Sequence, residues 1–345
     1  MDIHLESELR DTNFHDPKFV ERFLSGAAEK LQAIEQHCRA SDRDYNKGRW
    51  SLPKRVSHEE QLYQPIANIL NRIKNAVDNV HGYSPSMTLD SDSEHSTPEL
   101  FINNHDRAIN SDLDNTSKIK PDLVLFQDSH PHWESVRMPV EVKRLPGHHK
   151  AGMKQLSRYA RAVFAHQLHR RHLYGMMVCG TEATFVRFDR AGILYSSRVD
   201  IVEQSEIFTR ACASLLMLDR IDEGFDPAFT FERDEKGRLL YYIHLSESEL
   251  TRLFLDSTPD KTTGSTSTSN ERMRQFKVVE RLCHRQSICG RATIVLRIQE
   301  VPNPEQQVES EGPKGKQKEV LGPEPREYAL KIIWRDPARG SEGDV

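Results

Sequence analysis

Three charged residues in the middle of the chain have the types and spacing needed for metal-assisted hydrolysis. Asp122 opens an apolar run that ends at Phe126, and Glu141 and Lys143 lie two positions apart in a second run, 138–143. Alternate side chains of a strand point to the same face, so Glu141 and Lys143 share one. If the two runs pair as strands, Asp122 can lie beside Glu141. Two carboxylates are suited to Mg²⁺ or Mn²⁺, and Lys143 could orient or deprotonate a water.

Helices are predicted on both sides of these strands, and they must position the charged groups. Ser57 and Glu60 form a capping box, and an apolar stripe with helical spacing continues from there to Val77. Glu60 is therefore either a third acidic ligand or only the capping partner of Ser57. A second helix is predicted from about Lys150 to His169, where apolar residues again recur at spacings of three or four.

The composition of the chain excludes several classes of protein. Five scattered cysteines without metal-finger spacing predict a reduced, intracellular protein, cytoplasmic or nuclear. The N-terminus has no basic region followed by an apolar run, and no stretch approaches the roughly 20 apolar residues of a membrane span. We therefore expect neither a signal peptide nor a membrane partner. A mean hydropathy of −0.67 indicates that part of the chain is linker.

The order of the predicted elements indicates an α/β (α+β) domain with a central mixed sheet flanked by helices. We place this domain at 55–256, after a helical N-terminal extension at 1–54. A Ser/Thr-rich stretch at 257–271 is predicted to be a flexible linker. A second unit rich in strands follows at 272–345, and its Pro/Glu/Gly/Lys-rich insertion at 301–326 is predicted to be disordered.

The first helix, the two strands and the second helix together resemble the PD-(D/E)XK nuclease superfamily. Pro121-Asp122 is similar to its first motif, and Glu141-Val142-Lys143 is similar to its second. The alternative is an exposed strand with ordinary charges, because Glu-x-Lys is frequent by chance. The resemblance implies a nuclease-like fold, which is either an active enzyme or a fold retained as a binding module.

Two polar residues on the second helix extend the resemblance. Gln155 and Tyr159 are four residues apart and share one helix face. This spacing is similar to that of the RecB-type branch of those nucleases, in which both side chains line the site; the alternative is a helix with a half-buried tyrosine. As a whole, the resemblance implies a Mg²⁺ site with Asp122, Glu141 and Glu60 as metal ligands and Lys143, Gln155 and Tyr159 as catalytic residues.

The C-terminal unit carries a second pattern with chemical meaning. The predicted order along the chain is a strand, the turn Gly290-Arg291-Ala292-Thr293, another strand, and then a strand that contains Ala329-Leu330-Lys331. A protein kinase N-lobe begins in this order: backbone amides of the glycine turn cover the ATP phosphates, and the lysine pairs with them. Gly290 and Lys331 are therefore candidate ATP-binding residues. The turn is poor in glycine, because Ala292 stands where a second glycine is expected.

The two patterns in this order resemble the fungal-type protein kinase family. The resemblance covers about 55–336, is strongest at 118–201, and implies a fungal source and a kinase-like ATP-binding lobe. The C-terminal pieces are the glycine turn and the strand with Lys331. The other pieces are Lys120–Leu125, Val140–Lys143, Gln155–Arg161, Cys179-Gly180 and Phe188–Gly192.

The sequence departs from this family in one important respect. It contains no His-Arg-Asp catalytic loop after Lys331 and no Asp-Phe-Gly, so the base and the metal ligands of phosphoryl transfer are missing. We therefore expect a truncated family member with an incomplete kinase N-lobe and no kinase activity by itself. Its N-terminal domain would be regulatory or would bind a partner, either another protein or the missing kinase half.

Two alternative functions remain open. The first is a Mg²⁺-dependent nuclease that uses the carboxylates and Lys143. The second is a non-catalytic nucleic-acid-binding module, because 120–200 holds 13 Lys or Arg against 7 Asp or Glu. The basic side chains that would contact nucleic acid are Arg158, Arg161, Arg170 and Arg171. An ordinary solvated helix face is the competing interpretation.

Overall fold

The computed structural model describes most of the chain, and everything said below of the structure refers to that part. The described residues are 5, 7–41, 45–53, 55–81, 100–114, 116, 118–235, 237–250, 272–290, 292–302 and 326–334. The predicted linker at 257–271 and most of the insertion predicted at 301–326 lie outside these residues, so both remain predictions.

A large mixed sheet forms the centre of the N-terminal part of the described chain. Its strands follow the order β1-β9-β8-β7-β6-β5-β4, and β10 also pairs with β8. Neighbouring strands are antiparallel except for the pairs β6 with β7 and β1 with β9, which are parallel. The strands are β1 (Asn13–Asp16), β4 (Phe101–Asn103), β5 (Leu123–Phe126), β6 (Val136–Lys143), β7 (Leu173–Cys179), β8 (Glu182–Asp189), β9 (Gly192–Ser196) and β10 (Val199–Asp200).

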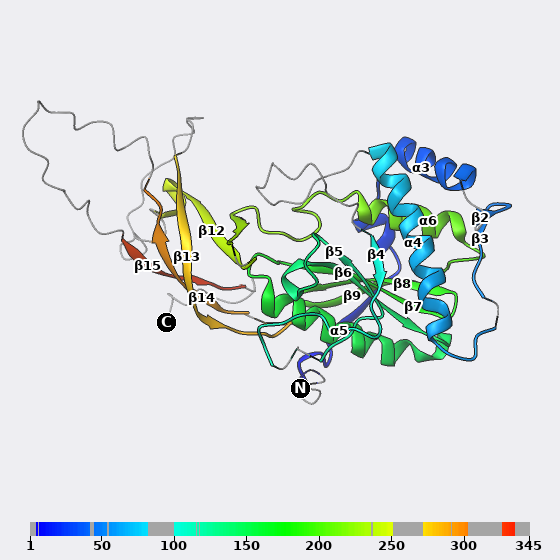
Figure 1. Cartoon of the computed structure of the whole chain (residues 1–345), viewed down its shortest axis with the longest axis horizontal. Helices are drawn as coiled ribbons and strands as arrows, with labels where there is room; N and C mark the ends of the chain where they lie inside the picture. The colour runs from blue at the N-terminus through cyan, green and yellow to red at the C-terminus, as the bar shows by residue number, and fades with distance from the viewer. Residues whose placement is uncertain are drawn as a thin grey trace, which may run out of the picture.

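Helices cover both faces of this sheet, as the sequence predicts for an α/β class (Figure 1). One face packs against α2, α3, α4 and α6, and the other packs against α5. This part of the chain also contains a small hairpin of β2 and β3 and two short 3-10 helices, η1 and η2. The elements are α2 (Phe19–Phe23), α3 (Ala28–Ser41), β2 (Tyr45–Asn46), β3 (Arg49–Trp50), α4 (Glu60–His81), η1 (Trp133–Ser135), η2 (Pro146–His148), α5 (His149–His166) and α6 (Ser205–Leu216).

The strand β5 shows why the site can form inside this fold. Its four residues are buried, with Leu123 and Leu125 in the core on the α4 side and Val124 and Phe126 in the core on the α5 side. An all-apolar strand suits a position covered on both faces. β5 and β6 are therefore held rigidly between two helical layers, and charged groups at their ends keep fixed positions.

The predicted helical N-terminal extension also contributes a strand. Asn13–Asp16 forms β1, which pairs in parallel with β9. The helices of this extension are the short α2 and the longer α3. Four residues do not carry a strand pattern that can be recognised in isolation, and the strand forms because β9, far along the chain, offers an edge.

A second, antiparallel sheet lies beside the first and has the order β11-β12-β13-β14-β15 (Figure 1). β11 and β12 precede the predicted linker, and β12 pairs with β13, which follows it. The alternate apolar residues of all five strands share one cluster. The second sheet therefore contains strands from both sides of the domain boundary predicted at 256. Its strands are β11 (Phe229–Arg233), β12 (Leu239–Ser246), β13 (Met273–His284), β14 (Ile294–Glu300) and β15 (Glu327–Ile332).

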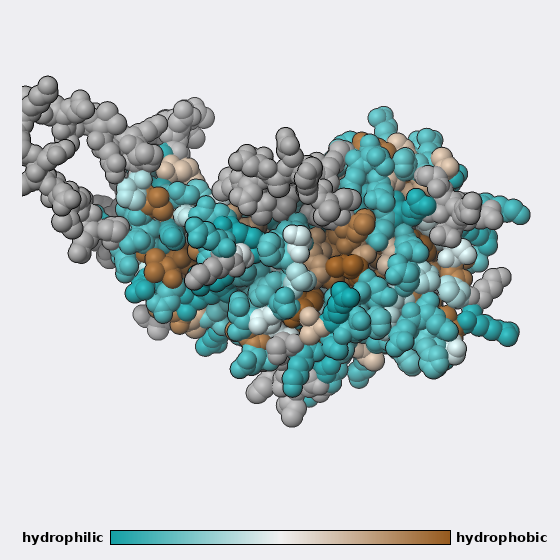
Figure 2. All heavy atoms as spheres, viewed as in Figure 1, coloured by the Kyte–Doolittle hydropathy of each residue, from teal (hydrophilic) through white to brown (hydrophobic). Residues whose placement is uncertain are grey.

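The visible surface is mostly hydrophilic, with two places where hydrophobic side chains gather (Figure 2). One lies beside β4, where Leu100 is 40% and Ile102 is 47% exposed, and the other lies over the second sheet. The helix α4 presents a hydrophilic outer face on the side of β4 away from the second sheet, as expected for an amphipathic helix whose apolar stripe is buried.

Candidate functional site

The register of β5 and β6 brings the two predicted carboxylates together. Leu123 pairs with Val140 in an antiparallel ladder, so the next pair along the strands is Asp122 and Glu141. The backbone N–H of Val142 donates to Asp122 Oδ2 at 2.8 Å. Both side chains are buried, with 8% of Asp122 and 1% of Glu141 exposed. The structure thus gives Asp122 and Glu141 the arrangement expected from the two sequence runs.

Lys143 and Tyr159 hold Glu141 from two sides. Lys143 Nζ lies 2.6 Å from Glu141 Oε1, because alternate residues of β6 share a face. The Tyr159 hydroxyl donates to Glu141 Oε2 at 2.6 Å and lies 3.0 Å from the carbonyl oxygen of Lys120. Tyr159 is on α5, so the helix after β6 completes the site. Each oxygen of the Glu141 carboxylate therefore has a fixed partner.

The acidic residue that reaches this site from the start of α4 is Glu59, which immediately precedes the helix, and not Glu60. Lys143 Nζ donates to Glu59 Oε1 at 3.0 Å, and the backbone N–H of Arg144 donates to Glu59 Oε2 at 2.9 Å. Glu60 is the first residue of α4, and it is exposed. The predicted capping box is displaced by one position, because Gln61 Oε1 accepts from the backbone N–H of Ser57 at 2.9 Å.

Sequence reasoning missed two residues here, and the displaced cap explains why. Because the cap uses Gln61 and not Glu60, the acidic residue in the turn before the helix is Glu59. Tyr63 follows Glu59 by four residues, the spacing of neighbours on one helix face, and its hydroxyl lies 3.4 Å from Glu59 Oε1. Gln155, predicted to line the site, lies one turn before Tyr159 on α5 and accepts from Arg158 at 2.6 Å.

The burial of these groups changes their protonation. Burial and then the charge of Asp122 raise the pKa of Glu141 to about 8, although Lys143 acts against them. Burial also raises the pKa of Asp122, despite the hydrogen bond from Val142. Burial alone would lower the pKa of Lys143, but the adjacent Glu141 outweighs it and raises that pKa above its ordinary value. At neutral pH the site therefore retains a proton on its carboxylates and a positive charge on Lys143.

The proton on Glu141 predicts how stability depends on pH. The unfolded residue loses its proton near pH 4.5 and the folded residue near pH 8. Between these values the folded state binds more protons than the unfolded state, so the free energy of unfolding falls as pH rises. The slope from this group approaches about 1.4 kcal/mol per pH unit.

This slope can be measured by urea unfolding at pH 5.5, 6.5 and 7.5, with Glu141→Gln beside the wild type. The buried histidines, whose pKa values burial lowers, act in the opposite direction in both proteins. The difference between the two proteins therefore reports on Glu141. We expect the wild type to lose stability relative to the variant as pH rises, and parallel curves would contradict the assignment.

The two carboxylates suit Mg²⁺, which takes few ligands from a protein, better than an ion whose ligands all come from protein side chains. Within the described ranges, no three His, Cys, Asp or Glu side chains are close enough together to form a complete ion site. Mg²⁺ is usually bound through one or two carboxylates and keeps several waters or substrate oxygens. Asp122 and Glu141, paired across β5 and β6, provide such a two-carboxylate set.

The basic residues proposed to contact nucleic acid do not form one exposed face. Arg170 is 3% exposed, donates to the carbonyl oxygen of Arg137 at 2.8 Å and lies over the Phe225 ring. Arg171 pairs with Asp226 at 3.0 Å. Arg170, four residues after the end of α5, is therefore a buried structural cation and not the exposed nucleic-acid contact proposed from the sequence.

The two residues predicted to bind ATP lie in the second sheet and its loops. Lys331 is an exposed residue of β15 and pairs with Val295 of β14. Gly290, in the loop between β13 and β14, has a φ of +99°, a left-handed conformation that glycine adopts easily. Its backbone N–H donates to the carbonyl oxygen of Arg190 at 2.9 Å, so this loop contacts the first sheet.

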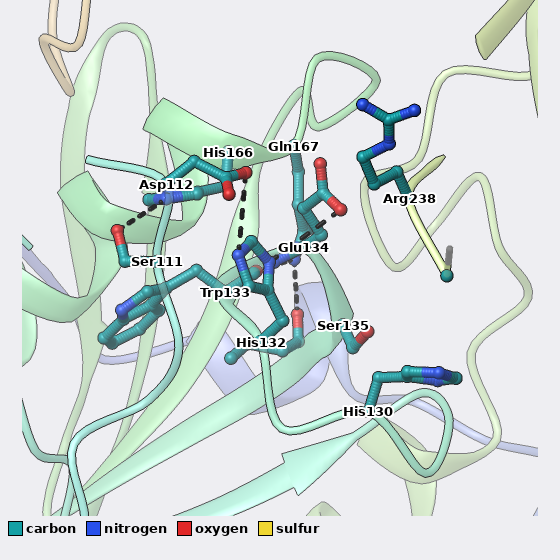
Figure 3. A network of polar contacts seen from close by, with 12 residues as sticks. Ser111, Asp112, His130, His132, Trp133, Glu134, Ser135, His166, Gln167 and Arg238 are labelled. Carbon is teal, nitrogen blue, oxygen red and sulfur yellow. Dashed lines mark hydrogen bonds and ion pairs between the residues drawn. The ribbon is translucent and has the colours of Figure 1, made fainter. Parts of the chain in front are cut away.

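A second polar network surrounds His132, Glu134 and His166 (Figure 3), and Arg281 of the second sheet contacts it. Glu134 lies 3.5 Å from Arg281 of β13, and burial raises the pKa of Glu134 to about 7. Ser111 Oγ lies 3.0 Å from Nε2 of His166, whose Nδ1 contacts the carbonyl oxygen of Ala162. The Ser111 hydroxyl is also engaged in its own turn, where it accepts from the backbone N–H of Leu113. These contacts hold the loops in place, and we assign no catalytic role to the residues that make them.

Comparison with known proteins places most of the chain in one family. The model of a family described as "Fungal protein kinase" matches residues 120–345. No curated protein and no solved structure matches the chain. None of the described helices is both long and apolar enough to span a membrane. The match begins at the residue before the Pro121-Asp122 motif and continues through β15, and the chain belongs to the fungal protein kinase family.

Proposed function

We propose that the α/β domain hydrolyses phosphodiester bonds of nucleic acid with the help of Mg²⁺ or Mn²⁺. The observation that supports this proposal is the convergence of Glu59, Asp122, Glu141 and Lys143 at the ends of β5 and β6. The resemblance of these residues to the PD-(D/E)XK motifs points to the same chemistry. When bound, the ion would polarise a phosphate oxygen and activate a water.

Each side chain has a separate task in this proposal. Asp122 and Glu141 are the groups that would hold the cation, and Tyr159 orients Glu141 through its hydroxyl. Lys143 keeps its proton at neutral pH, because Glu141 raises its pKa. We therefore assign Lys143 to orienting the water and stabilising negative charge on phosphate, and not to removing a proton. Glu59 holds the ammonium group in place.

Cleavage by the full chain tests this proposal. Single- and double-stranded DNA and RNA are incubated with the protein and either Mg²⁺ or Mn²⁺, and the products are separated on a denaturing gel. We expect cleavage of at least one substrate, and EDTA should abolish it. A protein that cleaves none of the four substrates with either ion would contradict the proposal, as would cleavage that survives EDTA.

We further propose two points about the C-terminal sheet. The first is that the chain by itself has no kinase activity, and the second is that the α/β domain has a regulatory role toward this sheet. The absence of His-Arg-Asp and Asp-Phe-Gly from the sequence supports the first part, because phosphoryl transfer needs a base or positioning residue and metal ligands. Ion pairs between the two sheets support the second. Arg233 of β11 lies 2.6 Å from Asp128, and Arg281 of β13 lies near Glu134.

The absence of transfer is directly measurable. With ATP labelled at the γ-phosphate and Mg²⁺, we expect no label on the chain itself, on casein or on myelin basic protein above the level of a boiled sample. Lys331→Met should give the same background. Incorporation that depends on Lys331 would contradict this part of the proposal.

A further inference from the structure

The loop between β13 and β14 is inserted into the α/β domain. Ile288, in the middle of this loop, is 0% exposed and belongs to the same hydrophobic core as Phe164 of α5 and Ile193 of β9. The loop is therefore held by the first sheet and its helix, although the strands on either side belong to the second sheet.

Arg190, in the turn between β8 and β9, holds the backbone of this loop. Its guanidinium donates to the carbonyl oxygen of Ser287 and lies 4.2 Å from the centre of the Phe164 ring. In return, the backbone N–H of Gly290 donates to the carbonyl oxygen of Arg190 at 2.9 Å. Arg190 is 6% exposed, and burial lowers its pKa to about 10, so it remains charged at neutral pH.

A carboxylate from the N-terminal segment accepts a hydrogen bond from the loop amide that precedes Gly290. Glu8 Oε1 accepts from the backbone N–H of Cys289 at 2.7 Å. The next amide, that of Gly290, is taken by Arg190. The two successive amides of this turn are therefore both occupied, one by a carboxylate and the other by a backbone carbonyl oxygen. Glu8 precedes the part of the chain that the family model matches.

We propose that this docked loop is an autoinhibitory contact, in which the Glu8 carboxylate and the Arg190 carbonyl oxygen occupy two backbone amides that would otherwise bind nucleotide phosphates. Backbone amides of a glycine turn bind phosphate only when they are free to point at it. In the docked loop the amides of Cys289 and Gly290 both have partners within the chain. The inference rests on the expectation, drawn from the similarity of the glycine turn to that of a kinase N-lobe, that these amides bind nucleotide phosphates, and not on the hydrolytic site.

Removal of the competing charge tests the contact in the full chain. Glu8→Gln keeps the size of the side chain but removes its negative charge, and Ile288→Gln removes the apolar anchor. Glu21→Gln is the matched control, because Glu21 is an exposed acidic residue on α2. Two quantities are measured for each protein: hydrogen exchange of the 284–293 amides, and the affinity for ATP with a fluorescent group on its ribose, in the presence of Mg²⁺.

We expect both loop variants to exchange the 284–293 amides at least tenfold faster than the wild type and to bind labelled ATP at least tenfold more tightly. The Glu21→Gln control should behave as the wild type. Equal ATP affinity in wild type and both loop variants would overturn the proposal, whether or not hydrogen exchange changes. Unprotected 284–293 amides in the wild type would overturn it as well. Nucleic-acid cleavage assayed on the same samples reports separately on the hydrolytic site.

Discussion

Replacing Lys143 with alanine should lower the rate of metal-dependent cleavage by about 10²–10³-fold, the usual effect of removing one group that stabilises developing charge. Lys143 lies between Glu141 and Glu59, with its ammonium group within 3.0 Å of a carboxylate oxygen of each. Its loss removes the basic group that contacts both of these carboxylates. The effect should appear in the turnover rate at saturating substrate.

A matched control separates this effect from a general loss of charge. Lys150 is an exposed lysine on α5, so Lys150→Ala removes the same charge from the same region. We expect Lys150→Ala to cleave at nearly the wild-type rate, and both variants to unfold at the wild-type temperature within a few degrees. Equal cleavage rates for Lys143→Ala and the wild type would remove Lys143 from the mechanism.

Replacing Trp133 with alanine should destabilise the protein by about 3–5 kcal/mol, the usual cost of truncating a buried tryptophan. Trp133 is 0% exposed in the core on the α5 side of the sheet. Its ring is stacked with that of Tyr159 at a centroid distance of 6.4 Å. The substitution therefore leaves a cavity directly behind the tyrosine that orients Glu141.

The measurement is the free energy of unfolding in urea, and Trp334 provides the control. Trp334 is 41% exposed at the end of the second sheet, so Trp334→Ala should change stability by only about 0.5 kcal/mol. Trp133→Ala should also slow cleavage, because Tyr159 loses its stacking partner. Equal stability of the two tryptophan variants would contradict the packing described here.

The sequence predicts the centre of this fold well because the signals there are local. The all-apolar run of β5, the alternation in β6 and the helical spacing of α5 each appear within a few residues. Pairing of two adjacent strands then places Asp122 beside Glu141 with no further information. The prediction that Asp122, Glu141 and Lys143 come together depends on these local patterns, and Tyr159 is expected at the site from the resemblance to the nuclease superfamily. The structure brings these four residues together.

The remaining features depend on distant contacts, which a single sequence does not reveal. Glu59 was missed in favour of Glu60 because a change of one position in a helix cap alters which acidic residue faces the strands. β1 pairs with β9, and β12 pairs with β13 across the predicted linker. The contact of Glu8 with Cys289 joins residues 281 positions apart. Such pairings are decided by tertiary packing, which overrides local preference.

Calorimetric titration of Mn²⁺ into the full chain at pH 8 tests the central claim most directly. The wild type is compared with a variant that carries both Asp122→Asn and Glu141→Gln. We predict one binding event per chain in the wild type, with release of protons as the ion displaces the proton held by Glu141. The variant should bind at least tenfold more weakly. Equal affinities in the two proteins, or no binding to the wild type, would contradict the assignment of these carboxylates to a metal-dependent hydrolytic site.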